Sequence, residues 1–79
     1  MKHWNKNKAY RNTWVHFELA PCGEYQFRDI KRELQNTPGK RFFATLGVSI
    51  YSFAAFPSLR ADFYFEDAGD ALYFKLKYL

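Results

Sequence analysis

The hydrophobic pattern first predicts a strand over residues 10–20, where apolar side chains occupy every second position. A period of two is typical of a strand whose two faces meet different environments. The core-facing positions would be Val15, Phe17 and Leu19, and the opposite positions Trp14, His16 and Glu18.

A change of period after this strand predicts a helix. Pro21-Cys22-Gly23 ends the alternation, and Phe27, Ile30 and Leu34 then recur at intervals of three and four residues with charged residues between them. This spacing is that of an amphipathic helix. Asn36-Thr37-Pro38-Gly39 favours a helix stop followed by a turn.

Two further stretches alternate with a period of two. Residues 40–53 predict a long strand, in which Gly47 allows either a bulge or a turn. Residues 59–65 predict a second strand, with Leu59, Ala61, Phe63 and Phe65 on one side. An antiparallel hairpin is the simplest connection between them.

The pattern ends with a second helix. Glu66 or Asp67 can cap its start, and acidic Asp70 near the start with basic Lys75 and Lys77 near the end suits the helix dipole. We expect one face of this helix to carry Ala68, Ala71, Leu72, Lys75 and Leu76.

The predicted order is β-α-β-β-α, to which one short strand could be added. It indicates an α+β fold, in which a small antiparallel sheet carries two helices on one face. A fragment of a ferredoxin-like fold would have this order. Residues 10–79 would form a single domain, and residues 1–9, rich in lysine and asparagine, would be a flexible basic arm.

Composition bears on which rings lie at the surface and on the cellular compartment. Aromatic residues make up 22% of the 79 residues, more than so small a core can enclose, so some rings should lie at the surface. A lone Cys22 argues against a disulfide framework, and neither an apolar signal segment nor a membrane span is apparent. These features predict a cytoplasmic protein that does not bind membranes.

No residue pattern predicts catalysis, a cofactor or a metal. The acidic residues Asp62, Glu66, Asp67 and Asp70 lack the spacing of a calcium loop and suit a helix start better. His16 and Cys22 could form a base and a thiol nucleophile, and His3 could join them at a metal. Nothing in their spacing supports either role, so we expect a protein that is not an enzyme and has no small-molecule substrate.

The segment Phe63-Tyr64-Phe65-Glu66-Asp67-Ala68-Gly69-Asp70-Ala71-Leu72-Tyr73-Phe74-Lys75-Leu76 resembles a pattern in small uncharacterised proteins of tailed phages. In that pattern an aromatic strand is followed by Phe-Glu-Asp, then Asp-Ala, then Phe-Lys-Leu. The resemblance covers about a fifth of the chain. It implies a phage origin and hence the host cytoplasm, and it implies no function for any residue.

The aromatic surplus gives the leading functional hypothesis. Rings at strand positions opposite the core would gather on the open face of the sheet, and aromatic side chains commonly anchor protein interfaces. The chain would then be a phage accessory protein that binds a host protein or itself through this face or through an edge of the sheet. The residues expected to carry binding are Trp14, Phe43, Tyr51 and Tyr64.

Nucleic-acid binding is the alternative hypothesis. A net charge of +4 on a short chain favours approach to polyanions, and neighbouring rings could stack on bases. The arm, the first helix and the start of the long strand would supply the basic residues, which are Lys2, Lys6, Lys8, Arg11, Arg28, Lys31, Arg32, Lys40 and Arg41.

Overall fold

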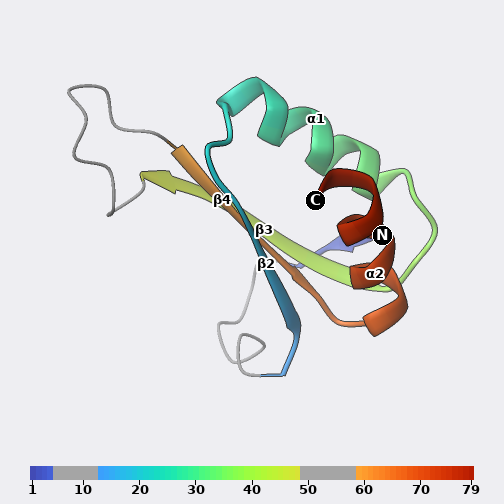
Figure 1. Cartoon of the computed structure of the whole chain (residues 1–79). Helices are drawn as coiled ribbons and strands as arrows, with labels where there is room; N and C mark the ends of the chain where they lie inside the picture. Colours follow the sequence, from blue (N-terminus) through green and yellow to red (C-terminus); the bar gives the residue numbers. More distant parts are fainter. Residues whose placement is uncertain (5–12, 49–58) are drawn as a thin grey trace.

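The computed structural model describes residues 1–4, 13–48 and 59–79, and these form a sheet with two helices on one face (Figure 1). The predicted α+β class is therefore confirmed. The elements in chain order are β1 (Lys2–His3), β2 (Val15–Leu19), α1 (Glu24–Gln35), β3 (Arg41–Val48), β4 (Leu59–Phe65) and α2 (Ala68–Tyr78).

The sheet has the strand order β1-β3-β4-β2. Strand β4 lies between β2 and β3 and is antiparallel to both. Helix α1 connects β2 to β3 and so crosses over β4. This is a split β-α-β unit, the arrangement found in ferredoxin-like folds. The register places Phe63 of β4 opposite both Phe17 and Ala44, so alternate residues of all three strands face the helices together.

The amino-terminal residues differ from the expected flexible arm. Lys2 and His3 form β1, which pairs in parallel with Arg41 and Phe42 of β3, so the sheet is mixed and not wholly antiparallel. Met1 is buried in the core. Its amino group donates to the carbonyl oxygens of Leu34 and Thr37, which ties the start of the chain to the end of α1 and the turn that follows it. The remainder of the expected arm lies outside the described residues.

Phenylalanine rings dominate the core between sheet and helices. Phe74 of α2 lies at its centre, with ring centroids 4.7 Å from Phe63, 5.1 Å from Phe65 and 5.9 Å from Phe17. Helix α1 adds Ile30 and Leu34, as its period predicts, with Phe27 partly buried beside them. The fully buried large side chains are Phe42, Phe63, Phe65, Phe74, Leu34 and Cys22.

Of the face predicted to carry the apolar residues of α2, only part is buried. Ala71 and Phe74 are buried, whereas Leu72 and Leu76 are exposed. The cap fixes the start of the helix, because Asp67 accepts a hydrogen bond of 3.1 Å from the amide of Asp70. Of the two predicted caps, the structure thus selects Asp67. Gly47 is paired with Arg60 in the regular ladder, so it marks neither a bulge nor a turn.

Candidate protein-binding face

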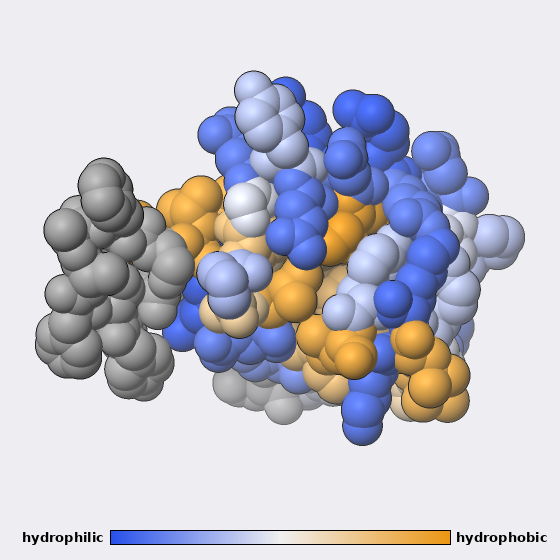
Figure 2. All heavy atoms as spheres, turned by 45° about the horizontal axis from the view of Figure 1, so that its top comes forward, coloured by the Kyte–Doolittle hydropathy of each residue, from blue (hydrophilic) through white to orange (hydrophobic). Residues whose placement is uncertain are grey.

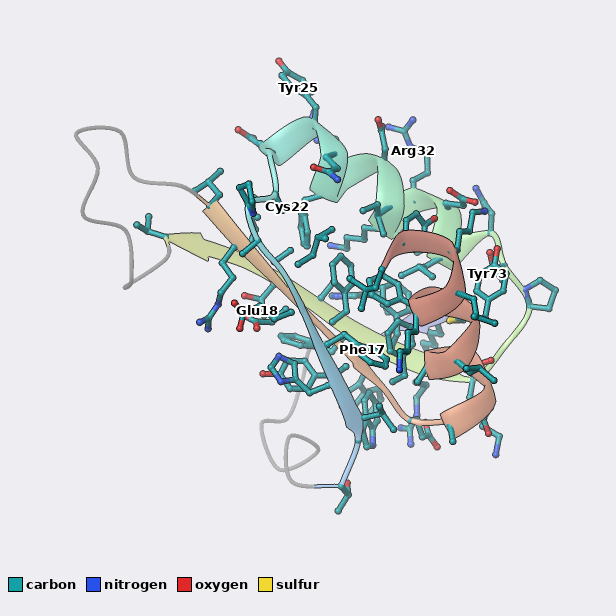
Figure 3. All side chains as sticks on the ribbon, viewed as in Figure 1. Phe17, Glu18, Cys22, Tyr25, Arg32 and Tyr73 are labelled. Atoms are coloured by element: carbon teal, nitrogen blue, oxygen red, sulfur yellow. The ribbon has the colours of Figure 1, made fainter. Side chains whose placement is uncertain are left out.

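The sheet surface opposite the helices, called the open face below, is covered by neither α1 nor α2 (Figure 1). In Figure 3, Glu18 and Phe17 project to opposite sides of β2, toward the open face and toward the helices respectively. Because successive side chains of a strand point to opposite faces, every second residue of each strand lies on the open face. Its described residues are Trp14, His16, Glu18, Arg41, Phe43, Thr45, Arg60, Asp62, Tyr64 and Glu66.

A row of rings crosses the open face from β2 over β4 to β3. The register sets His16 and Phe43 on either side of Tyr64. The rings of His16 and Tyr64 are stacked at 4.4 Å with an interplanar angle of 14°, and those of Phe43 and Tyr64 lie 6.0 Å apart. His3 lies beside the row at the edge of β3, stacked on Phe43 at 5.5 Å and edge-on to the buried Phe42 at 5.1 Å. We call Phe43, Tyr64 and His16 the aromatic row.

Arg41 joins two indole rings at one end of the open face. Its guanidinium carbon lies 4.6 Å from the ring centroid of Trp4 and 5.6 Å from that of Trp14, within cation–π range. Its Nε donates to Glu66 Oε2 at 2.5 Å. This hydrogen bond raises the pKa of Arg41 and lowers that of Glu66, so both groups are charged at neutral pH.

Ion pairs within the sheet occupy the other end of the open face. Asp62 accepts from His16 Nε2 at 2.8 Å and lies 3.3 Å from the guanidinium of Arg60. Arg60 also lies 3.8 Å from Glu18. The described open face therefore carries two arginines and three carboxylates, each in contact with an opposite charge.

The acidic residues near the start of α2 have separate structural roles. Asp67 caps the helix, and Asp70 accepts a 2.8 Å hydrogen bond from the amide of Lys40. Glu66 and Asp62 are paired on the open face as described. Among the described residues there is no group of three or more histidine, cysteine or acidic side chains that could hold a metal ion.

His3 binds the edge of β3 through its side chain. The amide of Ala44 donates to His3 Nε2 at 3.1 Å, a closer contact than the 3.4 Å between the same nitrogen and the Ala44 carbonyl oxygen. Desolvation, followed by the nearby charge of Lys31, lowers the pKa of His3 below its ordinary value of 6.5. The imidazole is therefore neutral at neutral pH, as accepting this hydrogen bond requires.

We expect the free energy of unfolding to decrease as the pH falls below about 6.5, where the unfolded chain takes up a proton on His3 before the folded chain does. The stabilising contribution of neutral His3 is complete above that pH, and it is lost as the pH falls toward the lower pKa that His3 has in the folded state. Urea unfolding at a series of pH values tests this. His3→Gln should remove this part of the decrease, whereas His16→Gln, which leaves His3 in place, should retain it. Equal pH dependence in wild type and His3→Gln would contradict the assignment.

The possible nucleophile–base pair is not assembled. Cys22 is buried in the core beneath the helices, and burial raises the pKa of its thiol, which disfavours the reactive thiolate. His16 lies on the open face, on the other side of the sheet, where it binds Asp62.

The described basic residues do not merge into one patch. Arg28, Lys31 and Arg32 are on α1, which covers the side of the sheet away from the open face, whereas Arg41 is on the open face. Arg28 pairs with Glu24 at 3.4 Å. Of the remaining basic positions in this prediction, Lys2 is exposed on β1 and Lys40 is 3.9 Å from Asp67. Lys6, Lys8 and Arg11 are outside the described residues.

A small pocket lies beside α1. Its volume is about 290 Å³, and it is lined by Glu24, Phe27, Arg28, Lys31 and Leu46. The opposite charges of Glu24 and Arg28 bind each other across one helical turn. The lining thus offers no set of converging polar groups for a reaction.

Of the four residues predicted for protein binding, the structure brings Trp14, Phe43 and Tyr64 to the open face, where all three are half-buried. Tyr51 lies outside the described residues. Sequence reasoning did not include His3, His16 and Trp4 in this set. The position of His16 opposite the core side of its strand was the one available signal.

Comparisons with protein-family models, curated proteins and solved structures found no match for this chain. A phage origin thus stays a prediction from the carboxy-terminal pattern. In the part of the chain that the structure describes, neither helix has the length and apolar character needed to cross a membrane.

Proposed function

We propose that this chain is a protein-binding module whose open face receives the surface of another protein. The observation that carries the proposal is the aromatic row, which crosses β3, β4 and β2 on a side that the helices leave uncovered. Rings with a polar tip, such as tyrosine and histidine, combine large contact area with few rotatable bonds. Such residues are enriched among the anchors of protein interfaces.

The charges of the open face favour a protein over a nucleic acid. Its two arginines are bound by carboxylates of the same face, and with Lys2, which the register places beside Arg41, the described acidic and basic residues balance. A phosphate backbone requires unbalanced positive charge, whereas a protein partner requires a surface without uncompensated buried charges. We therefore propose a partner that presents apolar side chains to the aromatic row and basic side chains near Glu18.

Affinity capture from a host lysate, with a single-ring variant and a matched control, tests the proposal. Tyr64→Ser should weaken capture of the partner by about 30-fold or more, the effect of removing an interface anchor. Tyr25→Ser removes an equally large ring, 78% exposed on α1, and should leave capture unchanged. Thermal unfolding of both variants controls for loss of the fold. Equal capture by the two variants would contradict a role for the open face.

Nucleic-acid binding is the second candidate, favoured by the net charge of +4 and by the stacked rings. It predicts an affinity for single-stranded nucleic acid that falls steeply with salt. Removing positive charge from α1 should weaken such binding, whereas Tyr64→Ser alone should reduce it only if the bases stack on the open face. Removal of charge from α1, which should leave protein capture by the open face unchanged, thus separates the hypotheses.

A further inference from the structure

Strand β2 forms one edge of the sheet, and its outer side has no neighbour among the described strands. Figure 1 views the sheet from this edge, with β1 fainter and more distant. The backbone N–H and C=O groups along such an edge can pair with another strand. The opposite edge is formed by β1, which has only two residues and offers little to pair with.

Helix α2 presents exposed leucines on its flank above this edge. Leu72, Leu76 and Leu79 are 55%, 79% and 55% exposed and recur at intervals of four and three residues, so they form one stripe, called the leucine stripe below. Figure 2 shows apolar side chains among the charged ones on the helical side.

The contacts of α2 determine the direction of this stripe. Tyr78 donates to Glu33 of α1 at 2.6 Å, and Lys77 binds the same carboxylate, so this flank of α2 adjoins α1. At about 100° per residue, Leu72 and Leu76 lie about 160° from Phe74, so the leucine stripe faces partly away from the sheet, on the side of α2 opposite Lys77. Because Lys77 adjoins α1, the stripe leans toward the β2 side of the molecule. Val15 of β2, on the helix side of the sheet, is also 38% exposed.

We propose that two copies of this chain pair through β2 in an antiparallel dimer, with the two leucine stripes in contact over the junction. A two-fold axis perpendicular to the sheet makes the paired strands antiparallel and keeps the helices of both copies on the same side. The dimer buries the open backbone edge and the leucine stripe in one interface. It is distinct from the proposed function, because it pairs the backbone edge of β2 and the leucine stripe, although its register also involves His16 and Glu18 of the open face.

Charge complementarity selects the register. Directly paired residues in an antiparallel ladder point to the same face. To keep the helices of both copies on one side, the possible registers of β2 with the β2 of the second copy therefore differ from one another by two residues. Pairing centred on Phe17 sets His16 opposite Glu18 of the second copy, and Val15 opposite Leu19. A shift of two residues would set either His16 or Glu18 opposite itself. Only the central register places opposite charge types together and apolar residues together.

Helix spacing fits the same arrangement. Phe74 of α2 contacts Phe17 of β2 as well as Phe63 and Phe65 of β4, so α2 lies over the β2–β4 pair. With strands about 4.8 Å apart, the two α2 helices would then be about 10 Å apart across the junction. Packed helices have axes about 8–10 Å apart, so the leucine stripes would be in contact without a gap.

Sedimentation equilibrium over a range of concentrations tests the dimer. Leu76→Glu places a charge in the leucine stripe and should weaken dimerisation at least tenfold, since about 1.4 kcal/mol changes an equilibrium constant tenfold. Tyr25→Glu, at a position of nearly equal exposure on α1, should leave the dimer intact. A wild-type chain that stays monomeric to about millimolar concentration, or equal dimerisation of the two variants, would overturn the proposal.

A charge exchange tests the register. His16→Glu sets two carboxylates opposite each other twice in the dimer and should weaken it, and adding Glu18→Lys should restore it. Failure of the double variant to recover, with its fold retained by circular dichroism, would overturn this register. Tyr64→Ser should not affect dimerisation, so failure of the dimer and failure of the proposed function are distinguishable.

Discussion

Replacing Phe74 with alanine is expected to lower the free energy of unfolding by about 3–5 kcal/mol, the cost of removing a fully buried phenylalanine. Its ring contacts Phe17, Phe63, Phe65 and Tyr78 from three different elements. The cavity would open where α2 meets the sheet, and no neighbour can fill it without leaving its own contacts. Stability is about 0.05–0.15 kcal/mol per residue, so this loss is a large fraction of the total for 79 residues.

Urea unfolding followed by circular dichroism measures the effect of Phe74→Ala as a lower midpoint or an absent transition. Tyr25→Ala is the matched control, because it also removes a large ring but from a side chain that is 78% exposed. Its free energy of unfolding should change by less than about 0.5 kcal/mol. Similar losses in the two variants would mean that Phe74 is not at the centre of the core.

The strands and the first helix could be predicted because their signals are local. Alternation along residues 59–65 places Phe63 and Phe65 on one side, and this set is buried. In α1 the apolar residues form a single stripe that ends in Leu34, which leaves one possible inward face. Each pattern therefore determined both the type of element and its orientation.

The sequence could not show which face of α2 meets the core, because the apolar residues of this helix form two stripes. Ala71, Phe74 and Tyr78 make one, and Leu72 and Leu76 belong to the other. Both have helical spacing, so periodicity cannot choose between them. The buried face is determined by the ring contacts of Phe74 with Phe17 and Phe63 and by the hydrogen bond from Tyr78 to Glu33. These are contacts between distant segments of the chain.

The candidate site was partly predictable for the same reason. Strand parity placed Phe43 and Tyr64 on one face, and the register sets them side by side. The contributions of β1 could not be predicted, because a two-residue parallel strand has no period of its own. Trp4 reaches Arg41 of the open face, and His3 reaches the edge of β3, only through the pairing of β1 with a strand about 40 residues later in the chain.

Substituting Gly39 with alanine is expected to destabilise the fold by about 1–3 kcal/mol, the usual cost of forcing an extra methyl group into a packed site. An added Cβ would lie 2.8 Å from Asp70 Oδ1 and 2.8 Å from Met1 Cγ. Neither neighbour can move freely. The Asp70 carboxylate accepts the amide of Lys40 at 2.8 Å, and Met1 is buried with its amino group bound to α1. The clash would therefore disturb the junction of β1, β3 and α2.

Two further variants separate this clash from the general effect of replacing glycine. Gly47→Ala, where nothing lies within 4 Å of the new Cβ, should be neutral or stabilising by up to about 1 kcal/mol, because alanine has less freedom in the unfolded chain. Asp70→Ala in the Gly39→Ala background removes one of the two clashing groups, so the double variant should lose less stability than the sum of the single changes. Strict additivity in urea unfolding would show that Asp70 does not confine Gly39. The close approach of Asp70 to Gly39 would then contribute nothing to holding the start of α2 against β3.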